Sequence, residues 1–234
     1  MKRTKINNVP GRRVDFHMHS LLSDGVLLPS EIVRRAESIG YEAIAITDHA
    51  DQSNLEWIIE RLLDFYRNLE KNACEVKVYV GVELTHVPPA SIPILASKAR
   101  RLGAQIVVVH GETIVEPVAE GTNMAAVECG EVDILAHPGL ISIEECDKAR
   151  SNDIYIELSS RKGHCLTNGH VAKLALEAEA KMLVNTDFHA PEDFISQEEA
   201  FLVALGSGVK QENAKKIVKD NVEELLKKLD KNLG

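Results

Sequence analysis

The chain alternates short apolar runs with longer amphipathic segments from end to end, and this alternation most constrains its fold. Seven runs rich in β-branched residues are predicted to be strands. They cover residues 14–18, 43–47, 76–82, 105–109, 134–136, 154–158 and 182–185. Each run is largely continuous in its apolar character, which is typical of a strand covered on both faces in a parallel sheet.

The segments between these runs have helical periodicity. The clearest covers residues 29–39, where Pro29 lies in the first turn, Ile32 and Val33 lie on the apolar stripe, and Gly40 marks the end. Further helices are predicted over residues 55–71, 91–102, 124–129, 143–151, 169–180 and 197–205. A last amphipathic helix over residues 212–229 is expected to pack against the barrel wall, if the strands close into a barrel.

Seven consecutive strand–helix units indicate an α/β fold, either an open doubly wound sheet or a closed barrel, and periodicity does not distinguish the two. The 234 residues contain no internal repeat and no linker, so a single domain is predicted over residues 1–234. Residues 1–13 carry five basic side chains and no acid, and are predicted to be a frayed end. Residues 111–123 are polar and irregular, which indicates a loop over the site.

Composition narrows the function classes. The chain is 44% apolar and 27% charged, as expected of a globular protein, and its formal charge of −9 argues against binding to long nucleic acids. It shows no signal-peptide pattern and no apolar stretch of membrane-spanning length, so a cytoplasmic protein without membrane contact is expected. The four cysteines form no C-x-x-C pair and are expected to be reduced thiols. A homo-oligomer is compatible with all of this.

Histidines and acids gather where the predicted strands end. The residues concerned are His17, His19, His49, Glu83, His110, His137, Asp187 and His189, with Asp24 in the loop that follows the first strand. In parallel α/β folds all strand carboxyl ends lie at the same edge, so these side chains are expected to converge. One such residue alone would be typical of a helix cap, but the recurrence over most of the strands favours a shared metal centre.

Imidazole and carboxylate ligands without thiolate suit Zn, Mn or Fe. Several such ions in one pocket indicate hydrolysis by a metal-activated water. The chain has no G-x-S-x-G elbow, no phosphate-binding G-x-x-x-x-G-K-[ST] loop and no G-x-G-x-x-G fingerprint, so nucleophilic serine chemistry and nucleotide-loop folds are disfavoured.

The chain resembles the PHP family, which is named for its polymerase-associated and histidinol-phosphatase members. The resemblance rests on the segments DFHMHSLLSDG, ITDHAD, GVELT, VVVHGE, LAHPG and NTDFHA, which occur in this order over nearly the whole chain. It implies a distorted (β/α)7 barrel of TIM-like form with parallel strands and a C-terminal helix. It also implies a phosphoesterase that uses two to three divalent metal ions.

The resemblance further implies which residues hold each ion. His17, His19, Glu83 and Asp187 would bind the first; Glu83, His110 and His137 the second; and Asp24, His49 and His189 the third. Glu83 would bridge the first two ions and is thereby a catalytic residue. A hydroxide bridging these ions would attack phosphorus in line.

Five other residues are candidates for supporting roles. Arg161 and Lys162, after the sixth strand, could bind a substrate phosphate. His86 and His164 could protonate the leaving oxygen if their pKa values lie near neutrality. Asp48 could orient His49 or a neighbouring ligand.

The function expected first is therefore hydrolysis of a small phosphate monoester, as by histidinol phosphatase. A phosphodiesterase or nuclease acting on nucleotides or short oligonucleotides is the alternative. A barrel that binds RNA or protein without catalysis, as in the related subunit of archaeal ribonuclease P, is the least favoured because the ligand set is complete.

Overall fold

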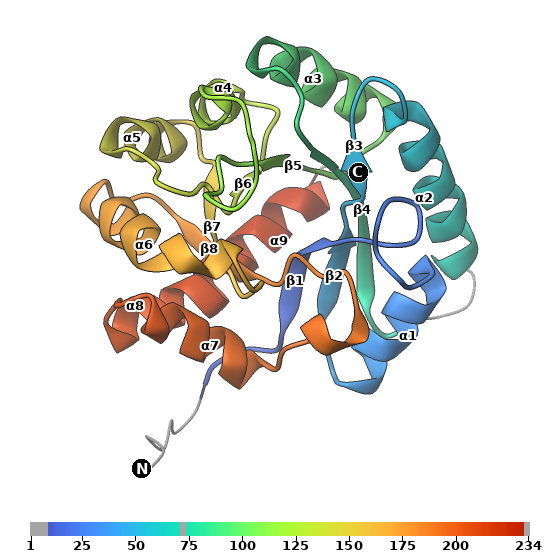
Figure 1. Ribbon diagram of the computed structural model, residues 1–234. Coiled ribbons are helices and arrows are strands. Elements are labelled where there is room, and N and C mark those ends of the chain that lie inside the picture. The colour runs from blue at the N-terminus through green and yellow to red at the C-terminus, as the bar shows by residue number, and fades with distance from the viewer. Residues whose placement is uncertain (1–8, 71–73, 232–234) are drawn as a thin grey trace.

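Seven parallel strands follow one another around a nearly closed barrel in the computed structural model, which describes residues 9–70 and 74–231 (Figure 1). The strands in order of pairing are β1 (Val14–Met18), β2 (Ala43–Ile46), β4 (Lys77–Leu84), β5 (Ile106–His110), β6 (Ile134–Ala136), β7 (Tyr155–Ser159) and β8 (Met182–Asn185). The two-residue strand β3 (His49–Ala50) continues the path of β2 and pairs with β4. The fold is therefore the barrel, and the open sheet is excluded.

The barrel closes between β1 and β8 through few backbone contacts. Met18 and Phe188 form an isolated parallel bridge, and the His19 amide donates to the Phe188 carbonyl at 2.7 Å. Side chains complete this seam: Asn185 Oδ1 accepts a hydrogen bond from the Phe16 amide at 3.1 Å, and the Arg13 guanidinium donates to the Val184 carbonyl at 2.9 Å. Fewer backbone hydrogen bonds therefore join β1 to β8 than join the other neighbouring strands of the barrel.

Arg13 corrects the prediction of a frayed segment up to residue 13. Its side chain is buried and pairs with the Asp15 carboxylate at 2.7 Å. Arg12 donates to the carbonyl of Tyr41 at 3.2 Å. These two charges are therefore part of the folded domain, while residues 1–8 lie outside the described residues.

An outer layer of helices surrounds the strands (Figure 1). These helices are α1 (Pro29–Ser38), α2 (Leu55–Glu70), α3 (Ile92–Leu102), α4 (Thr122–Glu128), α5 (Ile143–Ser151), α6 (Asn168–Glu177) and α7 (Gln197–Gly206). Short 3₁₀ turns occur at Pro89–Ser91, His164–Thr167 and Pro191–Asp193. The predicted helices agree with these bounds to within about three residues, and position 71 of the predicted second helix lies outside the described residues.

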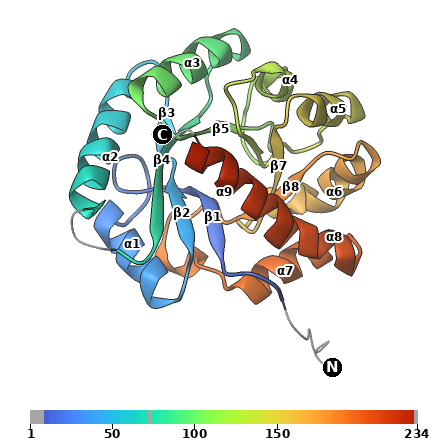
Figure 2. The same cartoon turned by 180° about the vertical axis from the view of Figure 1, so that it is seen from behind.

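The C-terminal helix packs in the outer core only through its first part, at Ala214, Ile217 and Val218, and its second part covers the amino-terminal end of the barrel (Figure 2). The helix was expected to pack against the barrel wall, which is correct for the first part and wrong for the second. It runs as α8 (Gln211–Lys215), a π-helical turn (Lys216–Asp220) and α9 (Asn221–Lys231). Val222, Leu225 and Leu229 pack on the side chains inside the barrel, including Tyr79 and Tyr155. An amphipathic pattern shows that one face is buried but does not say against which surface.

Replacing Leu225 by alanine is expected to lower the free energy of unfolding by about 2–5 kcal/mol, because the side chain is fully buried at this end of the barrel. Urea unfolding followed by circular dichroism measures the change. The matched variant Leu226→Ala removes a side chain that is only partly buried and should cost clearly less. Equal losses in the two variants would contradict the packing described.

A register shift in β1 determines which side chains reach the inside of the barrel. Phe16 belongs to the inner cluster, whereas Met18 packs in the outer core beneath the helices. The pairing of β1 with β2 shifts between Asp15 and Met18, and such an irregularity reverses the alternation of side chains. His17 and His19 can therefore both face the interior, with ring centroids 5.0 Å apart.

Gly81 makes room beneath the site. It lies on β4 between the inward-facing Tyr79 and Glu83, and a Cβ there would lie 2.6 Å from the Ile106 carbonyl oxygen and 2.4 Å from Ile106 Cγ2. Because no other residue lacks a Cβ, only glycine allows β5 to approach β4 this closely.

Candidate metal centre

The nine predicted ligands come together at the carboxyl ends of the strands. His17 and His19 come from the end of β1, His49 from β3, Glu83 from β4 and His110 from β5, while His137 follows β6, and Asp187 and His189 follow β8. Asp24 reaches the same place from the loop between β1 and α1. Their ligand atoms form overlapping groups in which all atoms lie within 4.8 Å of one another.

The innermost group surrounds Glu83 and Asp187, and the side chains of His17 and His19 are fully buried there. His17 Nε2 lies 3.3 Å from Glu83 Oε1 and 3.7 Å from Asp187 Oδ1. His19 Nε2 lies 3.2 Å from the same Asp187 oxygen and 3.6 Å from Glu83 Oε2. Two imidazoles and two carboxylates thus face one small volume.

A second group extends from Glu83 toward β5 and β6. His137 Nε2 lies 3.5 Å from Glu83 Oε1, and the His110 and His137 rings are 4.5 Å apart. Glu83 is shared with the innermost group, as expected of a bridging carboxylate. His137 and Asp187 have positive φ values of 26° and 51°, a backbone conformation that costs a non-glycine residue about 1–3 kcal/mol and is concentrated at functional sites.

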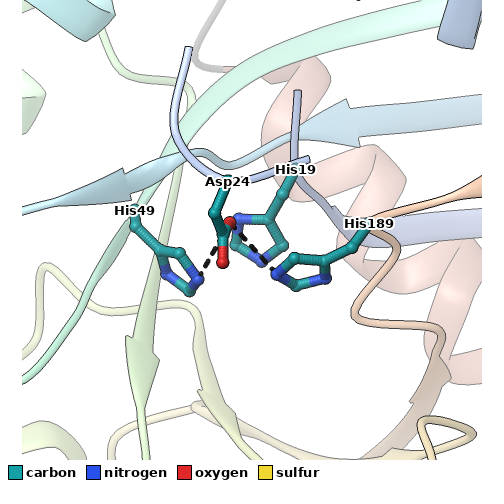
Figure 3. Close-up of side chains that lie close together, drawn as sticks. All are labelled: His19, Asp24, His49 and His189. Atoms are coloured by element: carbon teal, nitrogen blue, oxygen red, sulfur yellow. Dashed lines mark ion pairs between the residues drawn. The ribbon is translucent and has the colours of Figure 1, made fainter. Parts of the chain in front are cut away.

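A third group lies nearer the surface, around the Asp24 carboxylate (Figure 3). Asp24 Oδ1 lies 3.1 Å from His189 Nε2 and 3.4 Å from His49 Nε2. His19 also belongs to this group, and its ring is 4.1 Å from that of His49. The resemblance to the PHP family implied that His19 binds the first ion alone, and the structure places it in a second group as well.

Buried polar atoms without partners test whether this donor set fits metal ions. His17 Nε2, His19 Nε2 and Glu83 Oε1 are buried and have no hydrogen-bond partner. Such atoms cost about 1–3 kcal/mol each when left unsatisfied. They are imidazole nitrogens and a carboxylate oxygen that face one another, which is the donor chemistry of Zn, Mn and Fe sites. The residues therefore fit divalent cations.

The pKa shifts of the candidate ligands also favour cation binding. Burial raises the pKa of Glu83, but the His17 and His49 rings outweigh it and hold this pKa well below its usual range. Burial lowers the pKa of His49, but Glu83 and Asp24 outweigh it and raise this pKa to about 10. Burial and the neighbouring His49 lower the pKa of His19 to about 3. Ionised carboxylates therefore draw positive charge into the centre, and metal binding would displace protons from it.

Glu157 orients the candidate ligand His17 and was not predicted from the sequence. It is fully buried, and its Oε2 accepts a hydrogen bond from His17 Nδ1 at 2.8 Å and another from Asn185 Nδ2 at 3.1 Å. A histidine that donates through Nδ1 leaves Nε2 as its ligand atom. The only signal in the sequence is that this acid interrupts the apolar run of residues 154–158, which was predicted as a strand.

Asp48 fixes the loop that carries Asp24. Its carboxylate accepts hydrogen bonds from the Ser20 amide at 2.7 Å and from the hydroxyl groups of Ser20 and Ser23 at 2.8 and 2.6 Å. Among the hydrogen bonds of the described residues, none joins Asp48 to the His49 ring. His49 Nδ1 instead lies 2.6 Å from Thr85 Oγ1 and 2.6 Å from Glu83 Oε2.

A cavity of about 240 Å³ opens above the centre. It is lined by Asp24, His49, Thr85, His86, His110, Glu116, Arg161, His164, Asp187 and His189. Arg161 lies on its wall, where it donates to the Asp187 carbonyl at 2.9 Å and contacts His189 Nδ1 at 2.6 Å. Lys162 is exposed and is not among the lining residues, so the structure gives no support for its predicted contact with substrate.

The two histidines predicted to act as acids differ in burial. His164 is buried, its Nδ1 bonds Thr113 Oγ1 at 2.8 Å, and its Nε2 lies 3.6 Å from Asp187 Oδ2. Burial, aided by His137, lowers the pKa of His164 to about 4, so the expectation of a value near neutrality is wrong for this residue. His86 lies at the rim with 41% of its side chain exposed.

Glu116 is a second candidate functional residue that was not predicted from the sequence. It projects from the predicted loop over the site and places Oε2 3.0 Å from His110 Nε2. The loop was recognised from its polarity, but polarity did not indicate which of its acids would face inward.

Comparison with known proteins decides the family. The model of the PHP domain matches residues 15–228 of the chain. The chain belongs to the PHP family. This agrees with the resemblance carried by the six sequence segments and with the barrel.

Proteins with similar sequences carry names that refer to different activities. The chain is 51% identical over 217 residues to the uncharacterized protein MJ1295 of Methanocaldococcus jannaschii. This alignment covers 93% of this chain and 100% of that protein. It is 28% identical to ribonuclease P protein component 3 of Methanosarcina barkeri, over 63% of this chain and 56% of that protein. It is 27% identical to the DNA polymerase/3'-5' exonuclease PolX of Bacillus subtilis, over 75% of this chain and 34% of that protein.

Solved structures share the fold of the PHP domain. A chain in the cryo-EM structure of archaeal ribonuclease P with mature tRNA superposes with a TM-score of 0.69 at 19% identity, over 93% of this chain and 91% of that one. An amidohydrolase gives a TM-score of 0.59 at 12% identity, over 96% and 78% of the two chains. Among the helices of residues 9–70 and 74–231, none is long and apolar enough to cross a bilayer.

Proposed function

We propose that this PHP domain is a metal-dependent phosphoesterase that hydrolyses a small phosphate monoester. The observation that carries the proposal is the set of buried imidazole and carboxylate atoms that face one another without hydrogen-bond partners. A protein that only used the barrel as a scaffold would gain nothing from leaving these atoms unsatisfied. The cavity of about 240 Å³ above them suits a phosphate group with a small substituent better than a large ligand.

The proposed ligand set follows the three groups of side chains. His17, His19, Glu83 and Asp187 would hold one ion; Glu83, His110 and His137 a second; and Asp24, His49 and His189 a third, with His19 within reach. Divalent ions bound there would supply Lewis acidity toward the phosphoryl oxygens and lower the pKa of a bound water.

The chain's own residues would orient the substrate and handle its protons. Arg161 offers a planar guanidinium on the cavity wall for phosphoryl oxygens. His86 lies at the rim, where it contacts both the cavity and solvent, and is therefore the favoured donor of a proton to the leaving oxygen. Glu83, held ionised by its surroundings, would keep its two oxygens available to two cations.

The test is phosphate release from a panel of monoesters and diesters. The purified protein is stripped with a chelator and reloaded with Zn, Mn or Fe, and elemental analysis gives the metal content at each step. We expect metal-dependent release from small monoesters. A preference for diesters would replace this function by the alternative, a phosphodiesterase or nuclease. Absence of turnover with every metal and substrate would refute both.

The names of two relatives favour a function on nucleic acid, either as a nuclease or as an RNA-binding scaffold. One relative is named as a component of ribonuclease P and another as a 3'-5' exonuclease. The net charge of −9 weighs against a long nucleic acid. Short oligonucleotides in the diester panel test the nuclease, and a filter-binding measurement with structured RNA tests the scaffold. Tight RNA binding by metal-free protein without turnover would favour the scaffold over the enzyme.

Arg161→Gln is expected to raise KM for the best monoester by about tenfold or more, because a hydrogen bond to a charged group contributes about 1.5–3 kcal/mol. Lys162→Gln is the matched control, since it removes the neighbouring charge outside the cavity. Steady-state kinetics together with metal content measure both variants. An equal rise in KM for Lys162→Gln would show that overall charge, rather than the guanidinium on the cavity wall, binds the phosphate.

A further inference from the structure

The buried centre needs a route by which ions reach it. His17, His19 and Glu83 are fully buried, and among the described residues they do not line the cavity above them. His110 does line the cavity, although only 3% of its side chain is exposed. An ion must therefore pass from the cavity to atoms that lie beneath its floor.

A separate group of three potential ligands lies at the rim of this cavity. Glu116 Oε2 is 3.0 Å from His110 Nε2 and 3.3 Å from His86 Nε2, and the two imidazole rings are 4.8 Å apart. All three ligand atoms lie within 4.8 Å of one another. Two members of this group are exposed to solvent: 37% of the Glu116 side chain and 41% of the His86 side chain are accessible. This group therefore contacts solvent on one side and the cavity on the other.

His110 belongs both to this rim group and to the buried group with Glu83 and His137. Its Nδ1 donates to the Gly111 carbonyl at 3.2 Å, so Nε2 is the atom available to either group. One nitrogen binds one ion at a time. An ion bound at the rim could therefore keep its bond to His110 while it exchanges Glu116 and His86 for Glu83 and His137.

Charge favours approach from this side of the cavity. The Glu116 carboxylate is presented by an exposed loop, in which residues 114–117 are exposed to solvent. The Arg161 guanidinium lies with Asp187 and His189, on the side where Asp24 forms the other exposed carboxylate group. The fixed positive charge of Arg161 repels incoming metal ions there, whereas among the described residues the ion-pair partners of Glu116 are imidazole rings, with no lysine or arginine.

We propose that His86, His110 and Glu116 form a loading position, where divalent cations bind first before they move to the buried Glu83–His110–His137 group. The inference rests on the proposed metal centre and adds to it a function for Glu116. His86 is occupied only while an ion passes, so it remains available during turnover.

The rate of metal uptake tests the loading position. Chelator-treated protein is mixed with Co²⁺ in a stopped-flow instrument, and the visible absorbance of the coordinated ion reports its arrival. Glu116→Gln and His86→Gln are each expected to slow uptake by about tenfold, as local electrostatic capture changes rates by at least this much. The Co²⁺ bound per chain at saturation should stay the same. Release to a chelator should then slow by the same factor, since the equilibrium constant is the ratio of the two rates.

Glu120→Gln is the matched control, because it removes one charge from an exposed position of the same loop. This variant should take up Co²⁺ at the wild-type rate. Equal uptake rates in wild type and Glu116→Gln, or an equal slowing in Glu120→Gln, would overturn the loading position. A lower Co²⁺ content at saturation in Glu116→Gln would overturn it too, because Glu116 would then be a permanent ligand. If the wild type binds no Co²⁺ at all, it is the metal centre of the proposed function that fails.

Discussion

Glu83→Gln is expected to reduce phosphate release on the order of 10³-fold or more and to remove at least one ion per chain. Glu83 is the side chain whose two oxygens face the innermost group and the His110–His137 group at once. The amide has one oxygen acceptor and no charge, so it cannot neutralise two cations, and charge stabilisation of this kind is usually the largest catalytic contribution. Elemental analysis and turnover are measured on the same preparation.

The control for this variant is Glu75→Gln, which removes a carboxylate near the other end of β4. Glu75 is exposed and far from the carboxyl end of the strand, so neither metal content nor turnover should change. Full turnover and full metal content in Glu83→Gln would refute the bridging assignment. Loss of metal with retained turnover would show that the reaction takes place without the bridged pair.

Glu157→Gln is expected to weaken the tightest metal site by about 10–100-fold, which is the usual effect of removing the partner of a metal-bound histidine. The carboxylate fixes His17 through Nδ1 and supplies negative charge directly beneath it. The amide keeps one oxygen to accept that hydrogen bond but loses the charge. Calorimetric titration of the metal-free protein with Zn²⁺ or Mn²⁺ measures the affinity, and the number of sites should not change.

Two measurements separate positioning by Glu157 from a purely structural role. The melting temperature of metal-free Glu157→Gln should stay close to that of the wild type, because the buried hydrogen-bond acceptor is retained. Glu177→Gln, an exposed change at the end of α6, should leave both melting and metal affinity unchanged. An unaltered affinity in Glu157→Gln would show that His17 needs no charged partner.

The convergence of the candidate metal ligands could be predicted because topology alone brings these residues together. Parallel strands end at one edge, so His110 and His137 must be neighbours although 27 positions separate them in the sequence. Residues whose role depends on side-chain direction were not predictable. Glu157 stands within an apolar run, and only the inward pointing of every second residue of β7 directs it at His17.

Long-range packing limited the rest of the prediction. The amphipathic face of the last helix was recognised, yet nothing in its sequence distinguishes the end of a barrel from its wall. The five basic residues of positions 1–13 looked alike, but Arg13 meets a carbonyl on β8 that lies 171 positions away. The second group around His19 likewise follows from the irregular pairing of β1, which a periodic pattern does not show.

Metal ions bound at the proposed centre would stabilise the seam between β1 and β8, where few backbone hydrogen bonds join the strands. His17 and His19 stand on one edge of this seam, and Asp187 and His189 follow the other. An ion bound to both edges would be a cross-link between segments almost 170 positions apart, much as a disulfide would be. Occupancy would then fasten the two ends of the barrel sheet to each other, and the same ligand atoms that are proposed to hold the catalytic ions would keep the barrel closed.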